Sequence, residues 1–301
     1  MGLCIVIAAV TLSALLVPRL LVTLTPAPEV LREVMESATC RPPAPGVVHR
    51  DLTYPTGHWG SRRLDIYEPV GGCTRGEAPV VVFFHGGSWI KGDKVMIRII
   101  DRFLTRIREA GCFLIAVNYT TTPLLGLQGP RRNCEAAIRW IRAKAPEYGY
   151  DPDNLGLYGV SAGGHLALLT LSTMEEVPFS FGFIECAPTD LVAMREGDAF
   201  AKSSVFRLLP EGRLRALSPI THIRANQAPV LIFHGDADRT VHLNQSLLYQ
   251  EAAREVGAEV ELEVYPGGDH AFLNFDEETW KEQEERAFRF MSHAFKRKAR
   301  R

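Results

Sequence analysis

A serine flanked by glycines lies between two apolar stretches of the chain, in surroundings typical of a nucleophile. Residues 159–163 read Gly-Val-Ser-Ala-Gly, with the short apolar stretch 154–158 before them and the apolar stretch 164–169 after them. Where a buried strand turns sharply into a helix, only small neighbours fit, and the serine oxygen is held above the sheet edge. Ser161 is therefore a candidate nucleophile, although the Gly-x-Ser-x-Gly pattern alone also arises by chance.

A glycine-rich sequence follows another apolar stretch, residues 80–84, which has the composition of a buried parallel strand. It reads His-Gly-Gly-Ser-Trp and is expected to bring bare backbone N–H groups close to a reacting carbonyl. We predict that the N–H groups of Gly87 and Ala162 form an oxyanion hole, with Gly86 or Ser88 as a third donor. The alternative is a tight turn whose glycines serve only steric needs.

An acid and a histidine follow two later strand candidates. The apolar stretch 228–233 runs into His-Gly-Asp-Ala-Asp, and the alternating stretch 260–265 opens into Pro-Gly-Gly-Asp-His. The chain order is therefore Ser161, Asp238, His270. In a triad of this kind the histidine takes the serine proton, and the acid orients the histidine and stabilises its cation. This order is expected for an α/β-hydrolase and differs from that of chymotrypsin or subtilisin.

Taken together, these motifs resemble those of α/β-hydrolases of the esterase and lipase superfamily. Within it, the BD-FAE-type and hormone-sensitive-lipase-like carboxylesterases are the most similar, on the motifs at 85–89, 151–154, 159–165 and 234–238. The resemblance extends from about residue 49 to the C-terminus. It implies a mostly parallel eight-stranded sheet flanked by helices, and no cofactor. The chain departs from the hormone-sensitive-lipase group at 119–123, which read Tyr-Thr-Thr-Thr-Pro instead of a Tyr-Arg-Leu-Ala-Pro-like segment.

The choice of the acid rests partly on this resemblance. Similar enzymes with a His-Gly-x-x-Asp-x-x-Val sequence use the later aspartate, which here is Asp238. Asp236 is then expected to form a turn through backbone hydrogen bonds. Asp269 is a weaker candidate, because adjacent residues rarely face each other. The remaining histidines of the glycine-rich turns are expected to bind loop backbone: His85, His165 and His234.

The substrate pocket is less well defined by the sequence. Trp89 follows the oxyanion loop and Tyr119 follows the strand candidate 113–117, so both are candidates for substrate binding together with Ser88. The segment 188–228 is expected to form either a small lid or a plain crossover helix. A short lid suits small to medium acyl groups.

Other elements follow from periodicity. Residues 130–145, 244–256 and a helix near the C-terminus have the pattern of sheet-covering helices, and 181–186 that of a strand. The Asp-Pro-Asp at 151–153 is typical of a turn before the strand 154–158. The 301 residues carry a net charge of −1, which gives no sign of nucleic-acid binding.

The N-terminal residues 1–25 form a hydrophobic segment, interrupted by Pro18 and Arg19. Its length lies between that of a signal sequence and that of a membrane anchor, and it has neither a basic start nor a clear cleavage site. We expect an exported or membrane-anchored protein; the alternative is a cytoplasmic protein whose segment packs on the hydrolase. Residues 26–48 then form a linker, and 49–301 the catalytic domain.

The cysteines neither require nor exclude export. Cys112, Cys134 and Cys186 lie in or beside core elements and are expected to be buried thiols. Cys40 and Cys73 lie in loops and are available for pairing if the protein is exported. We find no cluster with the spacing of a zinc site.

The sequence thus predicts a serine carboxylic-ester hydrolase that works through an acyl-enzyme on a small-molecule ester. An amide-cleaving relative, such as a peptidase or formamidase, is the alternative because the same triad serves both reactions. An inactive hydrolase-like binding protein is a third hypothesis. The oligomeric state and the identity of the acyl and alcohol groups are left open.

Overall fold

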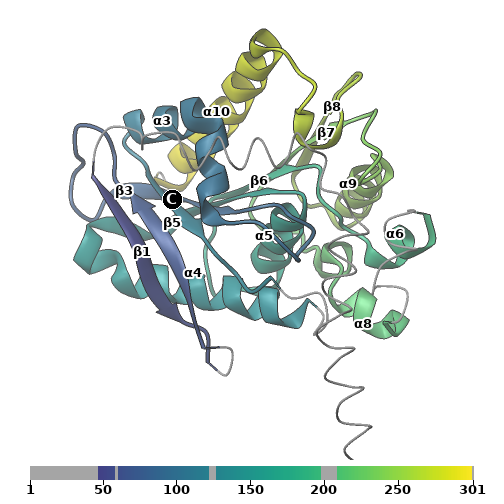
Figure 1. Cartoon of the computed structure of the whole chain (residues 1–301), viewed down its shortest axis with the longest axis horizontal. Coiled ribbons are helices and arrows are strands. Elements are labelled where there is room, and N and C mark those ends of the chain that lie inside the picture. The colour runs from purple at the N-terminus through teal and green to yellow at the C-terminus, as the bar shows by residue number, and fades with distance from the viewer. Residues whose placement is uncertain (1–46, 58–59, 122–126, 198–208, 300–301) are drawn as a thin grey trace, which may run out of the picture. The chain divides into compact units, whose positions relative to one another are not determined.

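A computed structural model describes residues 47–57, 60–121, 127–197 and 209–299 (Figure 1). The predicted hydrophobic segment 1–25 lies outside the described residues, as does nearly all of the linker 26–48. In the described part of the chain, no helix combines the length and apolar character needed to cross a membrane.

Among the described residues, eight strands form one sheet in the order β1-β2-β4-β3-β5-β6-β7-β8. β1 and β2 are antiparallel to their neighbours, and the other six strands run parallel. This confirms the predicted mostly parallel sheet. The strands are β1 (Val48–Pro55), β2 (Ser61–Tyr67), β3 (Ala78–Phe84), β4 (Phe113–Val117), β5 (Tyr150–Val160), β6 (Phe181–Glu185), β7 (Val230–Gly235) and β8 (Val260–Tyr265).

Helices cover both faces of the sheet, as Figure 1 shows. Side chains of α4, α5 and α9 share one hydrophobic core with one face, and side chains of α3 and α10 share a second core with the other. The helices are η2 (Lys94–Ile100), α3 (Asp101–Glu109), α4 (Gln128–Tyr148), α5 (Ala162–Thr173), α6 (Leu191–Gly197), α8 (Glu211–Ala216), η4 (Pro219–His222), α9 (Asn244–Val256), η5 (His270–Phe272) and α10 (Glu277–Ala299).

Strand β3 shows why the central strands are apolar without interruption. Val80, Val82 and Phe84 belong to the core beneath α4 and α5, whereas Val81 and Phe83 belong to the core beneath α3 and α10. Successive side chains of a strand point to opposite faces, so a strand covered on both sides needs apolar residues at every position.

Several predicted boundaries were wrong, such as 228–233 for the strand observed at Val230–Gly235, and two of these errors have a clear cause. The Asp-Pro-Asp at 151–153 lies inside β5 and not in a turn before it, because the pairing register with β3 shifts between Tyr150 and Leu155 and accommodates the proline. At the other boundary, β6 ends at Glu185, since Cys186 has a φ of 42° and leaves the strand conformation.

The parallel strands bring the candidate site residues to one edge of the sheet. Phe84 at the end of β3 pairs with Gly159 of β5, and Val160 pairs with Glu185 at the end of β6. Gly235 at the end of β7 pairs with Tyr265 at the end of β8. The loops that follow these strands therefore meet at the carboxyl edge, where open α/β sheets carry their sites.

Candidate active site

Ser161 lies in the sharp turn between β5 and α5. Its φ of 54° and ψ of −120° are unusual for a residue with a side chain, and its N–H donates to the carbonyl of Glu185 at 2.8 Å. A Cβ on Gly163 would collide with the carbonyl oxygen of Phe84, and one on Gly159 would collide with that of Gly163. The glycines of the motif are thus required by the close approach of β3, β5 and α5.

The structure brings His270 and Asp238 to this serine. His270 Nε2 lies 3.0 Å from Ser161 Oγ, and His270 Nδ1 lies 2.7 Å from Asp238 Oδ2. Because Nδ1–H donates to the carboxylate, Nε2 carries the lone pair that can accept a hydrogen bond from the serine hydroxyl. The His270 side chain is 25 % exposed, whereas that of Asp238 is fully buried. A reacting group can therefore reach the histidine, while the acid is shielded from water.

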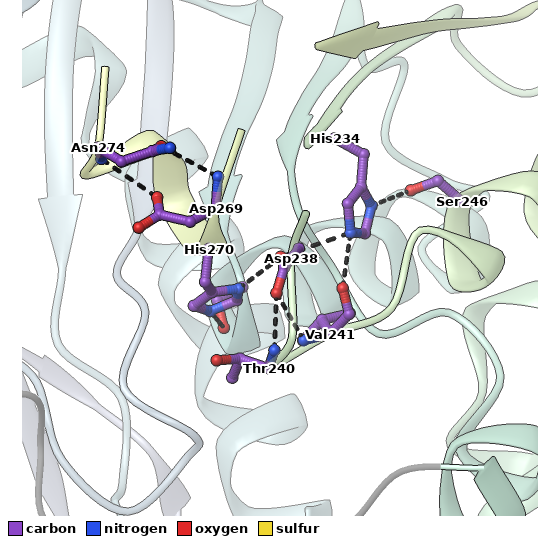
Figure 2. A network of polar contacts seen from close by, with 9 residues as sticks. His234, Asp238, Thr240, Val241, Ser246, Asp269, His270 and Asn274 are labelled. Atoms are coloured by element: carbon purple, nitrogen blue, oxygen red, sulfur yellow. Dashed lines mark hydrogen bonds and ion pairs between the residues drawn. The ribbon is translucent and has the colours of Figure 1, made fainter. Parts of the chain in front are cut away.

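The Asp238 carboxylate is surrounded by donors (Figure 2). Its Oδ1 accepts hydrogen bonds from the backbone N–H groups of Thr240, at 2.8 Å, and Val241, at 2.9 Å. Burial by itself raises the pKa of this acid, but hydrogen bonds from His234, His270 and Val241 outweigh burial and hold the pKa well below its usual range. Asp238 is therefore ionised at neutral pH.

His234, at the end of β7, holds the loop that carries the acid. Its Nε2 donates to the carbonyl of Val241 at 2.7 Å, and its Nδ1 accepts from the hydroxyl of Ser246 on α9 at 2.7 Å. The same Nε2 lies 3.5 Å from Asp238 Oδ2, as Figure 2 shows. Sequence reasoning gave this histidine a backbone contact but missed its contact with the acid. The four-residue spacing within His-Gly-Asp-Ala-Asp is the signal that points to it.

Cys186 lies beside Asp238 and His270, a contact that the sequence did not reveal. The Cys186 sulfur, a carboxylate oxygen of Asp238 and a ring nitrogen of His270 all lie within 4.8 Å of one another. Burial of the His270 ring lowers its pKa, whereas the Asp238 carboxylate raises the pKa, and the net shift is upward. The available signal was the position of Cys186 at the end of the predicted strand 181–186, which follows the motif of Ser161 along the chain.

The other two aspartates lie in contacts of their own. Asp236 accepts the N–H of Gly267 at 2.7 Å, which is the backbone contact expected of a turn former. Asp269 and Asn274 exchange two hydrogen bonds between side chain and backbone, at 3.0 and 3.2 Å (Figure 2). Of the three aspartates considered, Asp238 is the one paired with His270.

The predicted oxyanion loop has a strained backbone. Gly87, Ser88 and Trp89 have φ values of 117°, 53° and 60°, all in the left-handed region. A Cβ on Gly87 would collide with the carbonyl oxygen of Lys91, so glycine is required there. A Cβ on Gly86 would lie 3.6 Å from the Cβ of Ser161, which shows how closely this loop approaches the serine.

Two of the predicted substrate-binding residues, Trp89 and Tyr119, have buried side chains. Trp89 is 2 % exposed, and its indole N–H donates to His165. Tyr119 is 3 % exposed; its hydroxyl donates to the carbonyl of His85 at 2.6 Å, and its ring stacks on the imidazole at 4.2 Å. Both side chains therefore support the loop from inside, and a direct contact with substrate stays a prediction for them and for Ser88.

The segment 188–228 is described in part. It contains α6, α8 and η4, while residues 198–208 lie outside the described residues. The candidate lid therefore stays a prediction. Among the cysteines, Cys112, Cys134 and Cys186 are buried and Cys73 is exposed. Cys40 lies outside the described residues.

Curated relatives with similar sequences bear esterase names. The probable carboxylic ester hydrolase LipM of Mycobacterium tuberculosis is 28% identical over 244 residues, which are 74% of this chain and 56% of LipM. The probable isoprenylcysteine alpha-carbonyl methylesterase ICMEL1 of Arabidopsis thaliana is 27% identical over 253 residues, 75% of this chain and 51% of the relative. The chain thus spans about half the length of the curated relatives it matches.

Solved structures with the same fold are also esterases. Esterase 2 of Thermogutta terrifontis with bound propionate has a TM-score of 0.67 and 26% identity, covering 82% of this chain and 94% of its own. The same esterase phosphoramylated by tabun has a TM-score of 0.69 and 27% identity, covering 84% and 96%.

A family match covers the middle of the chain. The BD-FAE family matches residues 64–252, from β2 to α9, a range that includes Ser161 and Asp238 and ends before His270. That range is more than half of the 301 residues. The motifs of the chain, the order of its strands and its esterase relatives all agree with this match. The chain belongs to the BD-FAE family of α/β-hydrolases.

Proposed function

We propose that the protein is a serine carboxylic-ester hydrolase. The observation that carries this proposal is the position of His270, whose Nε2 lies 3.0 Å from Ser161 Oγ while its Nδ1 lies 2.7 Å from the buried Asp238. A serine hydroxyl is a weak nucleophile at neutral pH and needs a base within hydrogen-bond reach. His270 meets this need, and Asp238 keeps its ring in the required tautomer.

The reaction proceeds through an acyl-enzyme. His270 takes the proton as Ser161 Oγ attacks the ester carbonyl carbon, and the resulting oxyanion accepts hydrogen bonds from the N–H groups of Gly87 and Ala162, with Gly86 or Ser88 as a third donor. One such donor is worth about 3 to 4 kcal/mol of the barrier. His270 then gives the proton to the leaving alcohol, and water releases the acid by the same steps.

The relatives support this chemistry. The matched proteins of Mycobacterium tuberculosis and Arabidopsis thaliana are named as ester hydrolases, and the esterase of Thermogutta terrifontis forms covalent organophosphorus adducts. Propionate and butyrate are bound in structures of that esterase. By analogy we propose small to medium acyl groups as the substrates of this chain.

The first test combines turnover with covalent labelling. The purified protein is assayed with p-nitrophenyl acetate, butyrate and octanoate, with acetylated and feruloylated sugars, and with the matching p-nitroanilides. We expect ester turnover that falls with acyl length, and labelling by a fluorophosphonate probe. Faster cleavage of the anilides than of the esters would overturn the ester assignment.

The second test locates the nucleophile. Ser161→Ala is expected to lose both turnover and labelling. Ser172→Ala is the matched control, because Ser172 is a buried serine on the adjoining helix α5. Labelling that persists in Ser161→Ala would place the nucleophile elsewhere.

We also propose that residues 1–25 direct export or anchor the protein to a membrane. Their apolar composition supports this role. Cell fractionation tests it: removal of residues 1–25 is expected to shift active protein from the membrane or exported fraction to the cytosol. Recovery of the full-length chain in the cytosol would contradict the proposal.

A further inference from the structure

We propose that His165 is a positioning residue that holds the oxyanion loop, residues 85–93, through the indole of Trp89. The inference rests on the proposed ester hydrolysis, because the loop supplies the predicted Gly87 donor. It goes further by assigning a role to a buried histidine that lies outside the triad.

The contact between the two side chains is direct and fully buried. Trp89 Nε1 donates to His165 Nδ1 at 3.2 Å, and the ring centroids lie 5.2 Å apart with the planes at 86°. Trp89 is 2 % exposed and His165 is 0 % exposed. Water therefore does not compete for this hydrogen bond.

The second ring nitrogen fixes the tautomer. His165 Nε2 lies 2.8 Å from the carbonyl oxygen of Leu217, which can only accept, so Nε2 carries the proton. A neutral imidazole then has a single lone pair, on Nδ1, and Trp89 uses it. Burial lowers the pKa of His165 to about 4, so the ring stays neutral at ordinary working pH.

The loop needs such an anchor because its backbone is strained. Gly87, Ser88 and Trp89 have consecutive positive φ values, and residues other than glycine adopt this region at an energetic cost. A strained segment persists only where its surroundings hold it. Trp89 lies two residues after Gly87, so a loosened indole allows the loop to relax and to move the Gly87 N–H.

The other end of the contact is itself held in place. Leu217 directly follows α8, and the hydroxyl of the next residue, Ser218, accepts the N–H of Leu191 at 2.9 Å and donates to Leu214 at 2.8 Å. His165 thus joins the oxyanion loop, helix α5 and the turn between α8 and η4.

The decisive variants are Trp89→Phe and His165→Ala. Trp89→Phe removes the indole N–H and keeps an aromatic ring. For p-nitrophenyl acetate we expect kcat to fall roughly ten- to a hundredfold in each variant, with KM changed by less than about twofold, because oxyanion donors act mainly in the transition state. The double variant is expected to be no slower than the poorer single variant.

Two further variants separate positioning from packing. His165→Gln keeps a donor and an acceptor on one side chain and is expected to recover part of kcat. Trp140→Phe is the matched control, since Trp140 is a half-buried indole on α4, and kcat is expected to stay unchanged. Raised KM with an unchanged kcat in Trp89→Phe, or additive losses in the double variant, would overturn the proposal.

Readouts that need no activity keep this inference apart from the proposed function. Nitrogen NMR is expected to show His165 protonated at Nε2, and hydrogen exchange is expected to quicken over residues 86–92 in Trp89→Phe, with the central strands unchanged. Unchanged exchange in that loop would refute the positioning role. An absence of ester turnover in the wild type, with the exchange result as expected, would instead refute the proposed function alone.

Discussion

Two buried carboxylates at the carboxyl edge of the sheet behave in opposite ways. Asp238 follows β7, and Glu185 ends the neighbouring strand β6; they are 3 % and 9 % exposed. The pKa of Asp238 lies well below its usual range, whereas the pKa of Glu185 is raised to about 7. Burial alone therefore does not determine whether a carboxylate of this protein is charged.

The difference lies in the donors around each group. Asp238 accepts two backbone N–H groups and the N–H of His270. For Glu185, burial raises the pKa most; the Tyr158 hydroxyl, donating at 3.1 Å, opposes it, and the negative charge of Glu284 adds to it. Donors fixed by the fold keep Asp238 charged. Glu185, which lies beside α10, has fewer donors to offset the effect of burial on its pKa.

The largest expected effect comes from removing the charge of Asp238. Asp238→Asn is expected to lower kcat/KM by roughly 10³ to 10⁴, because the amide cannot both orient His270 and stabilise its cation. Steady-state kinetics on p-nitrophenyl acetate measures the loss. A decrease below tenfold would mean that another group supplies the acid.

The second prediction concerns stability. Since folding raises the Glu185 pKa from 4.5 to about 7, the folded state disfavours its ionised form, and the protein loses stability as pH rises between these values. Glu185→Gln removes this loss and is expected to be more stable by up to about 3 kcal/mol at pH above about 8. Urea unfolding at several pH values measures this gain, which should vanish near pH 4 or so.

The control for Glu185→Gln is its catalytic activity, measured as kcat/KM. The Glu185 side chain lines a small cavity with Tyr158 and with Gln283 and Glu284 of α10, among side chains of the core beneath α3 and α10. Glu185→Gln is therefore expected to keep kcat/KM within about twofold. A stability gain that is equal at all pH values would point to packing and not to charge.

A third prediction uses the pH dependence of the triad. Only neutral His270 can accept the serine proton, so activity is expected to be lost as pH falls through the pKa of His270, which the Asp238 carboxylate raises. Asp238→Asn removes a negative charge that raises this pKa. The acid limb of the pH profile of the residual kcat/KM is therefore expected to move to lower pH. An acid limb at the same pH as in the wild type would show that the Asp238 charge does not affect the pKa of His270.

The smallest effect is expected at Asp236. Its carboxylate accepts the N–H of Gly267 in an exposed turn, away from the His270 nitrogen that binds Asp238. Asp236→Asn keeps an acceptor oxygen and is expected to change kcat/KM by less than about twofold. A loss equal to that of Asp238→Asn would exchange the roles of the two acids.

The sequence was most informative where chemistry and local pattern coincide. The β4 and β8 strands match the predicted stretches 113–117 and 260–265, and β3 and β5 end beside the predicted glycine motifs. Residues that follow parallel strands of one sheet share an edge, which is why the sequence could predict that Ser161, Asp238 and His270 lie close together.

The features that the sequence did not predict depend on the direction in which side chains point and on the pairing register of the strands. The direction of the Trp89 indole follows from the left-handed backbone of its loop, so its burial against His165 had no local signal. The approach of Cys186 to the triad follows from a positive φ just beyond β6. The proline within β5 is tolerated because of a register shift with β3, which one strand alone does not reveal.

The pairing between distant parts of the chain has a consequence for folding. His270 and Ser161 are separated by 109 positions, and His270 and Asp238 by 32, so no short fragment contains all three residues of the proposed triad. Parallel pairings between distant segments form late, because loop closure costs entropy before the contacts form. Recovery of catalytic activity after dilution from denaturant is thus expected to lag behind recovery of helical circular dichroism, and turnover would report the completion of the sheet.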